Sequence, residues 1–207
     1  MSLVTVAAPQ TARVRMTAHE RREQLLDVTK AIVGEQGFHA VSIESVARAA
    51  RISRPIVYAH FEGLNELLGA LLEREGRRAL SQLAAILPTD LEEGDPRELL
   101  LAALRGYLEA VRADPVTWRL VLVPPEGAPD LLRERVEDGR EAVVAALARV
   151  VAPGLAPGRT TPDPTLTARL LSAVADEAAR LTLTDPDEYP IERLMAHARW
   201  LLDELRG

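Results

Sequence analysis

Apolar residues recur at helical intervals along most of the chain, and no segment alternates between apolar and polar positions as a β-strand does. We therefore expect an all-α protein with about nine helices. Beyond a region of short helices near the N-terminus, the pattern predicts helices over residues 64–87, 96–112, 116–123, 130–151, 165–184 and 190–206. Residues 152–164 are rich in Pro and Gly, which predicts a mobile connection without regular structure.

The first helix has clear start and stop signals. Thr17 and Glu20 have the spacing of a capping box, in which each side chain bonds the other residue's backbone N–H. Gly37 tolerates the left-handed backbone that commonly ends a helix. The buried side is expected to carry four residues at helical spacing, which are Leu25, Val28, Thr29 and Ile32.

Residues 42–61 predict two short helices joined by a tight turn. Ser42 is placed to cap the first of them, and Ser53 is placed to cap the second. Pro55 falls in the first turn of the second helix, where a missing N–H costs little. The helix that Ser42 caps carries one apolar stripe, made of Ile43, Val46, Ala47 and Ala50.

The second short helix is expected to bury Ile56, Val57 and Phe61. Its other side would then present Arg54, Pro55 and Tyr58 to solvent, since positions 54 and 58 share a face one turn apart. Two short helices in this arrangement form a helix-turn-helix, which lays its second helix in the major groove of DNA.

Residues 17–68 resemble the DNA-binding domain of the TetR family of bacterial transcriptional regulators. The residues that carry the resemblance, in order, are Gly37-Phe38, Ser42-Ile43, Val46-Ala47, Ala50, Ser53, Tyr58, His60 and Phe61. The resemblance implies three parts: an N-terminal tail at 1–16, a three-helix DNA-binding domain at 17–63, and a helical effector-binding and dimerisation domain at 64–207.

Two positions depart from the family pattern. The turn position that usually holds Gly is Arg51, which would cost on the order of 1 kcal/mol if its φ is positive. Arg51 could instead extend toward a phosphate. Where the family often has a phosphate-contacting Lys, this chain has Leu64, so its salt dependence of DNA binding is expected to be shallower by about one phosphate.

We expect DNA contacts from one group of residues: Ser42, Arg51, Ser53, Arg54, Pro55, Tyr58 and His60. Arg54 would meet guanine and Pro55 a thymine methyl, although Arg54 could equally contact only a phosphate. Tyr58 and His60 would contact phosphate or sugar, or alternatively pack at the corner after the helix. Ser42 and Ser53 cap helices in either case, and helix N-termini attract phosphate.

The chain's net charge of −6 is unevenly distributed. Residues 1–60 hold eight Lys or Arg against five Asp or Glu, which leaves +3 there and −9 over residues 61–207. A basic head on an acidic body fits DNA binding through one end. Because the margin is small, affinity is expected to depend on dimerisation.

The last two predicted helices have broad apolar faces. In TetR-like proteins such helices form a four-helix bundle across a two-fold axis, although the same faces could pack only on their own body. The interface residues expected on this basis are Leu166, Leu170, Val174, Leu194, Ala198, Leu201 and Leu205.

The resemblance also implies an effector pocket among the body helices. Its expected lining, which could alternatively be ordinary core, is Leu104, Tyr107, Leu108, Val111, Trp118, Leu122, Val143, Leu147, Val174 and Glu177. Tyr107 and Trp118 each offer an apolar face with one polar handle. Asp176 could meet a polar ligand group, but pairing with Arg180 four residues later is the favoured expectation.

We predict a homodimeric, effector-released repressor that binds a palindromic DNA operator and a small-molecule effector in the cytoplasm. No catalytic or metal-binding motif is present, and the chain has no Cys, so we expect no enzyme activity, no cofactor and no metal. No apolar stretch is long enough to span a membrane. The alternative is a helical ligand-sensing or protein-interaction module whose DNA binding is weak or lost.

Overall fold

The computed structural model describes residues 16–86, 94–123, 130–155, 158 and 160–204, with only the backbone over 130–136. These residues form nine α-helices and one short 3-10 helix. Their bounds are α1 Ala18–Gln36, η1 Phe38–Ala40, α2 Ile43–Ala49, α3 Arg54–Tyr58, α4 Leu64–Ile86, α5 Pro96–Ala113, α6 Pro115–Leu122, α7 Asp130–Val151, α8 Pro164–Thr184 and α9 Ile191–Glu204. The expected all-α fold is confirmed, and the predicted helices match to within about two residues. Most of the predicted tail at 1–16, and Leu205, lie outside the described residues.

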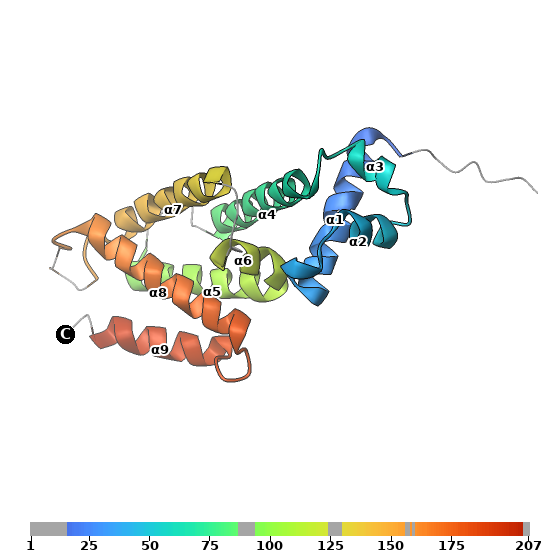
Figure 1. Ribbon diagram of the computed structural model, residues 1–207. Helices are drawn as coiled ribbons and strands as arrows, with labels where there is room; N and C mark the ends of the chain where they lie inside the picture. The colour runs from blue at the N-terminus through green and yellow to red at the C-terminus, as the bar shows by residue number, and fades with distance from the viewer. Residues whose placement is uncertain (1–15, 87–93, 124–129, 156–157, 159, 205–207) are drawn as a thin grey trace, which may run out of the picture.

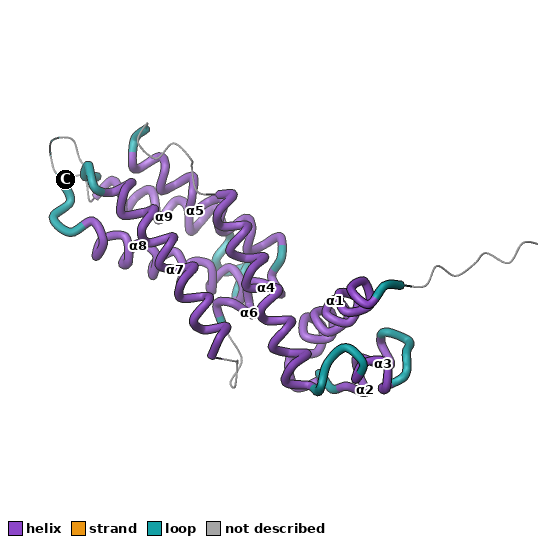
Figure 2. The backbone as a smooth tube through the Cα atoms, turned by 90° about the horizontal axis from the view of Figure 1, so that it is seen from above, coloured by secondary structure: helices purple, strands orange, loops and turns teal. Residues whose placement is uncertain are grey.

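The molecule is elongated, with α1, α2 and α3 at one end and α5 to α9 at the other (Figure 1). We call these parts the head and the body. The long helix α4 runs from one to the other (Figure 2). Its first half contributes Leu67, Leu71 and Leu72 to the head core, and its second half contributes Ala79 to the body core. Tilting the head against the body must therefore move α4.

Local signals set the start and end of α1. The Glu20 amide donates to Thr17 Oγ1 at 3.2 Å, and the Thr17 amide donates to Glu20 Oε2 at 2.7 Å, so the predicted capping box is confirmed. Gly37 follows the helix with φ 83°. Its amide donates to the carbonyl of Val33, which satisfies one of the last carbonyl groups of α1.

A buried polar cluster joins the head to the body. Lys30 of α1 donates to Glu75 of α4 at 2.8 Å and to Thr117 of α6 at 2.7 Å, and it lies 2.9 Å from Asp114 at the start of α6. The Thr117 hydroxyl also bonds the Glu75 carboxylate, which is fully buried. Arg74 pairs with Glu75 at 2.8 Å. We call these five residues the junction cluster.

The junction cluster keeps its carboxylates ionised. Burial by itself would raise the pKa of Glu75, but hydrogen bonds from Lys30 and Thr117 and the charges of Lys30 and Arg74 together lower it. The pKa of Asp114 is lowered in the same way: burial opposes the shift, and the bonds from Lys30 and Thr117 outweigh burial. Lys30 of the head is thus held to α4 and α6 by opposite charges that stabilise one another's ionised forms.

Candidate nucleic-acid interface and effector cavity

The helix-turn-helix forms as the sequence predicts, beginning with the cap of α2. The Ser45 amide donates to Ser42 Oγ at 3.0 Å, and the Ser42 amide donates to Ser45 Oγ at 2.9 Å. The predicted stripe of α2 is buried: Ile43, Val46, Ala47 and Ala50 all belong to the head core. The second predicted cap differs, because Ser53 occupies the N-cap position of α3 but its side chain makes no capping bond.

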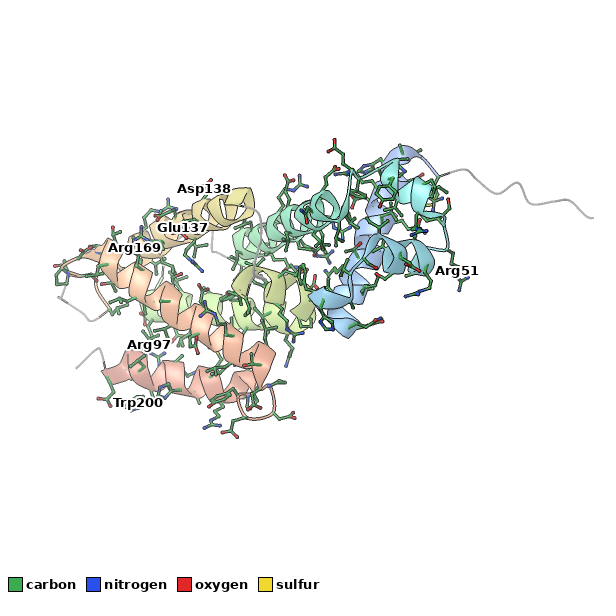
Figure 3. The ribbon with its side chains drawn as sticks, in the orientation of Figure 1. Arg51, Arg97, Glu137, Asp138, Arg169 and Trp200 are labelled. Carbon is green, nitrogen blue, oxygen red and sulfur yellow. The ribbon has the colours of Figure 1, made fainter. Side chains whose placement is uncertain are left out.

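Arg51 has a left-handed backbone, with φ 56°. Its amide donates to the Arg48 carbonyl at 3.1 Å, and the next amide, of Ile52, donates to the Ala47 carbonyl at 3.0 Å. These two bonds make a Schellman motif, which usually has Gly at the left-handed position. The arginine therefore costs about 1 kcal/mol in backbone strain. Figure 3 shows its side chain at the outer end of the head, pointing away from the body.

The outward face of α3 carries the expected residues. Arg54 and Pro55 are exposed, and Tyr58 is 54% exposed. Ile56 was expected to be buried, and this is wrong, because it is 40% exposed. The helix has five residues, and Val57 and Phe61 already define its inner side at a spacing of four. Ile56 consequently adds an apolar side chain to the outward surface.

His60 is half-buried at the end of α3. Its carbonyl accepts a bond from Arg22 of α1 at 2.6 Å, and the Arg22 guanidinium lies 4.2 Å from the centre of the Phe61 ring. Arg22 also lies 3.7 Å from Glu66 of α4. Arg22 thus holds the end of α3 against α1 and α4. Sequence analysis missed this role, because the partners are 38 and 44 positions away along the chain.

Three exposed arginines lie on the helix-turn-helix. Arg48, Arg51 and Arg54 are exposed on α2, the turn and α3, and none forms an ion pair with a described residue. The body arginines with acidic partners include Arg97, Arg140, Arg169, Arg180 and Arg193. The positive charge of the turn and α3 is therefore available to an external anion.

The body contains a cavity of about 380 Å³ that is partly open to solvent. Residues of α4, α5, α6, α7, α8 and α9 line it, and most of them are aliphatic. Eight of the ten residues expected from sequence are on its wall: Leu104, Tyr107, Trp118, Leu122, Val143, Leu147, Val174 and Glu177. The other two expectations are wrong, since Leu108 and Val111 are fully buried in the body core instead.

One polar cluster interrupts the apolar wall of the cavity. Asp176 of α8 accepts a bond from the Tyr107 hydroxyl at 3.0 Å and pairs with Arg140 of α7 at 2.8 Å. The expected pairing of Asp176 with Arg180 is wrong, because Arg180 pairs with Glu177 at 3.1 Å. Burial, and then the charge of Asp176, raises the pKa of Tyr107 far above its usual value, so the hydroxyl stays protonated and donates.

An exposed apolar stripe runs along α8. Leu166, Leu170 and Val174 are 53%, 61% and 56% exposed, and their spacing of four places them on one face. The residues expected on α9, which are Leu194, Ala198 and Leu201, are half-buried and line the cavity. The exposed Trp200 also lies on α9 (Figure 3).

The head geometry defines a helix-turn-helix protein of the kind that binds DNA. In agreement, residues 25–71 match the family model described as "Bacterial regulatory proteins, tetR family". The head therefore carries the DNA-binding domain of the TetR family. Within the described residues, no cluster of His, Asp or Glu could hold a metal ion, and no helix is long and apolar enough to cross a membrane.

Two relatives match the chain over about half its length. The transcriptional activator FasR of Mycolicibacterium smegmatis is 31% identical over 52% of this chain and 48% of its own. The transcriptional regulator BetI of Yersinia pestis is 32% identical over 55% of this chain and 58% of its own. The matched region thus spans about half the length of these relatives.

Solved structures share the whole fold at lower identity. A TetR-like transcriptional regulator from Rhodococcus sp. RHA1 superposes with a TM-score of 0.69, at 24% identity over 92% of this chain and 97% of its own. The fatty acid degradation regulator FadR from Bacillus halodurans superposes with a TM-score of 0.64, at 17% identity over 88% of this chain and 94% of its own. These likenesses concern the fold alone.

Proposed function

We propose that this protein is a transcriptional regulator that binds an operator as a homodimer and is released by a small-molecule effector. The observation that carries the DNA-binding part is the outward surface of the turn and α3. Arg51 and Arg54 lie there without an acidic partner among the described residues, beside the exposed Pro55 and Tyr58. Cations that have no partner of their own are free to neutralise phosphates or bond guanine.

We assign the contacts by position on that surface. Arg54, Pro55 and Tyr58 face outward and meet base edges or the adjacent backbone. Ser42, Arg51 and Ser53 lie at the ends of α2 and α3, where they contact phosphates. His60 is half-buried, and its carbonyl accepts a bond from Arg22. Of the seven proposed DNA-contacting residues, His60 therefore contributes least to DNA binding.

We propose that dimerisation uses the exposed stripe of α8 together with α9. Leu166, Leu170 and Val174 form a continuous apolar face that a second copy would bury. Two-fold symmetry then presents two recognition helices, and half-sites about 34–36 Å apart would admit both to successive major grooves. The operator would accordingly be palindromic, and access to it places the protein in the cytoplasm.

The effector occupies the cavity and acts by a population shift. The cavity wall and the junction cluster share sequence neighbours: Gly76 and Trp118 line the cavity, while Glu75 and Thr117 hold Lys30. A ligand that favours one position of α4 or α6 therefore favours one head orientation. Operator affinity would fall by the coupling free energy, typically about 1–3 kcal/mol.

An Arg54→Ala variant tests the DNA interface in an electrophoretic shift assay with upstream genomic DNA over a series of salt concentrations. If Arg54 bonds a guanine, the loss is about 1–3 kcal/mol, and discrimination at that base pair is lost. If it contacts a phosphate, binding weakens on all sequences and the salt slope falls by about one. Arg77→Ala is the matched control, because Arg77 is exposed on α4 and has no ion pair with a described residue.

Light scattering on the same samples checks that the dimer is intact. Unchanged affinity in a dimeric Arg54→Ala variant would remove Arg54 from the interface. The alternative function, a sensing or interaction module without DNA binding, predicts that the unmodified protein forms no sequence-selective complex. Transcription from the bound promoter, measured with and without the protein, tells a repressor from an activator.

A further inference from the structure

We propose that the cavity selects an uncharged, elongated apolar ligand with a hydrogen-bond donor such as a hydroxyl group, and that the Tyr107–Asp176–Arg140 cluster excludes charged molecules of the same size. This inference deepens the proposed function by naming the chemical class of its effector. It rests on the shape of the cavity and on how its polar groups are partnered.

The shape of the cavity favours a long molecule. Its wall extends from Gly76 to Ile86 on α4 and from Leu171 to Leu181 on α8. Ten helical residues advance about 15 Å along the axis, so the cavity is much longer than a compact metabolite. Its volume of about 380 Å³ lies within the range of small-molecule sites.

The charged groups on the cavity wall already pair with groups of opposite charge. Arg140 lies 2.8 Å from Asp176, and Glu177 lies 3.1 Å from Arg180. The Trp118 indole N–H donates to Gln82 at 2.9 Å. A ligand carboxylate would have to draw Arg140 away and leave Asp176 without its cation. A ligand ammonium would draw Asp176 away and leave Arg140 with only its longer contact to Glu137, at 3.5 Å. Either charge therefore breaks the Arg140–Asp176 pair in a mostly apolar place.

The cluster can still receive one neutral group. Asp176 accepts one bond from Tyr107 on Oδ1 and one from Arg140 on Oδ2. An ionised carboxylate offers about four acceptor positions, so a ligand hydroxyl can donate to Asp176 without displacing either partner. Tyr107 also lies edge-on to Trp118, with ring centres 5.1 Å apart, which fixes the direction of its hydroxyl.

His197 is the remaining titratable group on the wall. It is exposed on α9 and lies against Trp200, with ring centres 5.2 Å apart. Because His197 is exposed while Tyr107 is buried and Asp176 and Arg140 are half-buried, the cluster is the feature that decides the charge preference of the cavity.

The test compares three unbranched probes of ten carbon atoms: 1-decanol, decanoate and decylammonium. Each is titrated calorimetrically into the full chain without DNA, below the concentration at which it aggregates. We expect 1-decanol to bind at least tenfold more tightly than either ion. A preference below tenfold, or no binding of 1-decanol, would overturn the proposal.

Two variants assign the preference to the cluster. Asp176→Asn leaves Arg140 with only its longer contact to Glu137, at 3.5 Å, so binding of decanoate relative to 1-decanol should improve at least tenfold. Arg140→Gln leaves Asp176 without its cation, so decylammonium should gain by a similar factor. Tyr107 can still donate to Asn at position 176, and circular dichroism confirms that each variant is folded.

Glu141→Gln is the matched control, because it breaks another α7–α8 ion pair, with Arg169 at 2.6 Å, outside the cavity wall. Figure 3 shows Arg169 on α8. Its three affinities should equal those of the unmodified protein. If neither cluster variant changes its ratio, the cluster does not set the preference and the proposal fails.

DNA binding is measured separately on the ligand-free protein. Selective DNA binding without any 1-decanol binding would reject this inference and leave the proposed operator binding intact. Binding of 1-decanol without any operator complex would reject the proposed operator binding and leave this inference intact.

Discussion

Replacing Lys30 with methionine tests whether the junction cluster holds the head to the body. Lys30 is the single lysine among 25 basic residues of the chain, and it contacts Glu75, Asp114 and Thr117 within 3.0 Å. Methionine keeps a long unbranched side chain and removes the ammonium group. The variant therefore isolates the charge and its hydrogen bonds from the packing of the side chain.

The expected loss follows from the groups left behind. Removing one partner of a buried ion pair costs about 3–5 kcal/mol, since the other charge stays buried. Here Arg74 still pairs with Glu75, and Arg78 still lies 3.1 Å from Asp114. We therefore expect the lower end, about 3 kcal/mol in the free energy of unfolding. In a protein of this size, that lowers Tm by about 6–12 °C.

Urea denaturation followed by circular dichroism measures this loss. Glu75→Gln should be similarly harmful, and the double variant should lose less than the sum of the two, because both charges of the pair are then gone. Arg169→Met is the control, because its partner Glu141 is exposed, and it should leave the denaturation midpoint unchanged. A loss below about 1 kcal/mol for Lys30→Met, or strict additivity in the double variant, would refute the coupling of these charges.

Three further predictions concern acid stability, the turn and the cavity. Because the pKa values of Glu75 and Asp114 are lowered by folding, their stabilisation is complete above about pH 5 and is lost as pH falls through the folded values. Urea denaturation at a series of pH values should show a flatter acid limb for Lys30→Met, and equal slopes would contradict this. Arg51→Gly should raise the free energy of unfolding by about 1 kcal/mol, because glycine adopts the positive φ without strain. A loss of stability would show that Arg51 is not strained. Weaker operator binding in the same variant would indicate that Arg51 contacts a phosphate. Gly139→Ala places a Cβ against the Leu80 side chain, which must then move, so calorimetry should show weaker 1-decanol binding, and an unchanged affinity would count against Leu80 as cavity wall.

Local pattern was enough to predict the helices, their caps and the outward face of α3. A capping box needs residues only three positions apart, and a helix face needs residues three or four apart. The same spacing misplaced Ile56. With only five residues in α3, the burial of neighbouring side chains depends on how Val57 and Phe61 dock into the head core. Ser53 was placed correctly as N-cap, but the orientation of its hydroxyl was not predictable from position.

The sequence by itself determined which helices exist, which family the head resembles and which residues of α3 face outward, because those features depend on contacts within one or two helical turns. Only the tertiary structure decided the partners of the buried charges. Asp176 pairs with Arg140, 36 positions away, and not with Arg180 one turn along α8. Lys30 meets partners 45, 84 and 87 positions away. The physical reason is that a buried charge needs an opposite charge wherever packing brings one close, and no local period encodes that position.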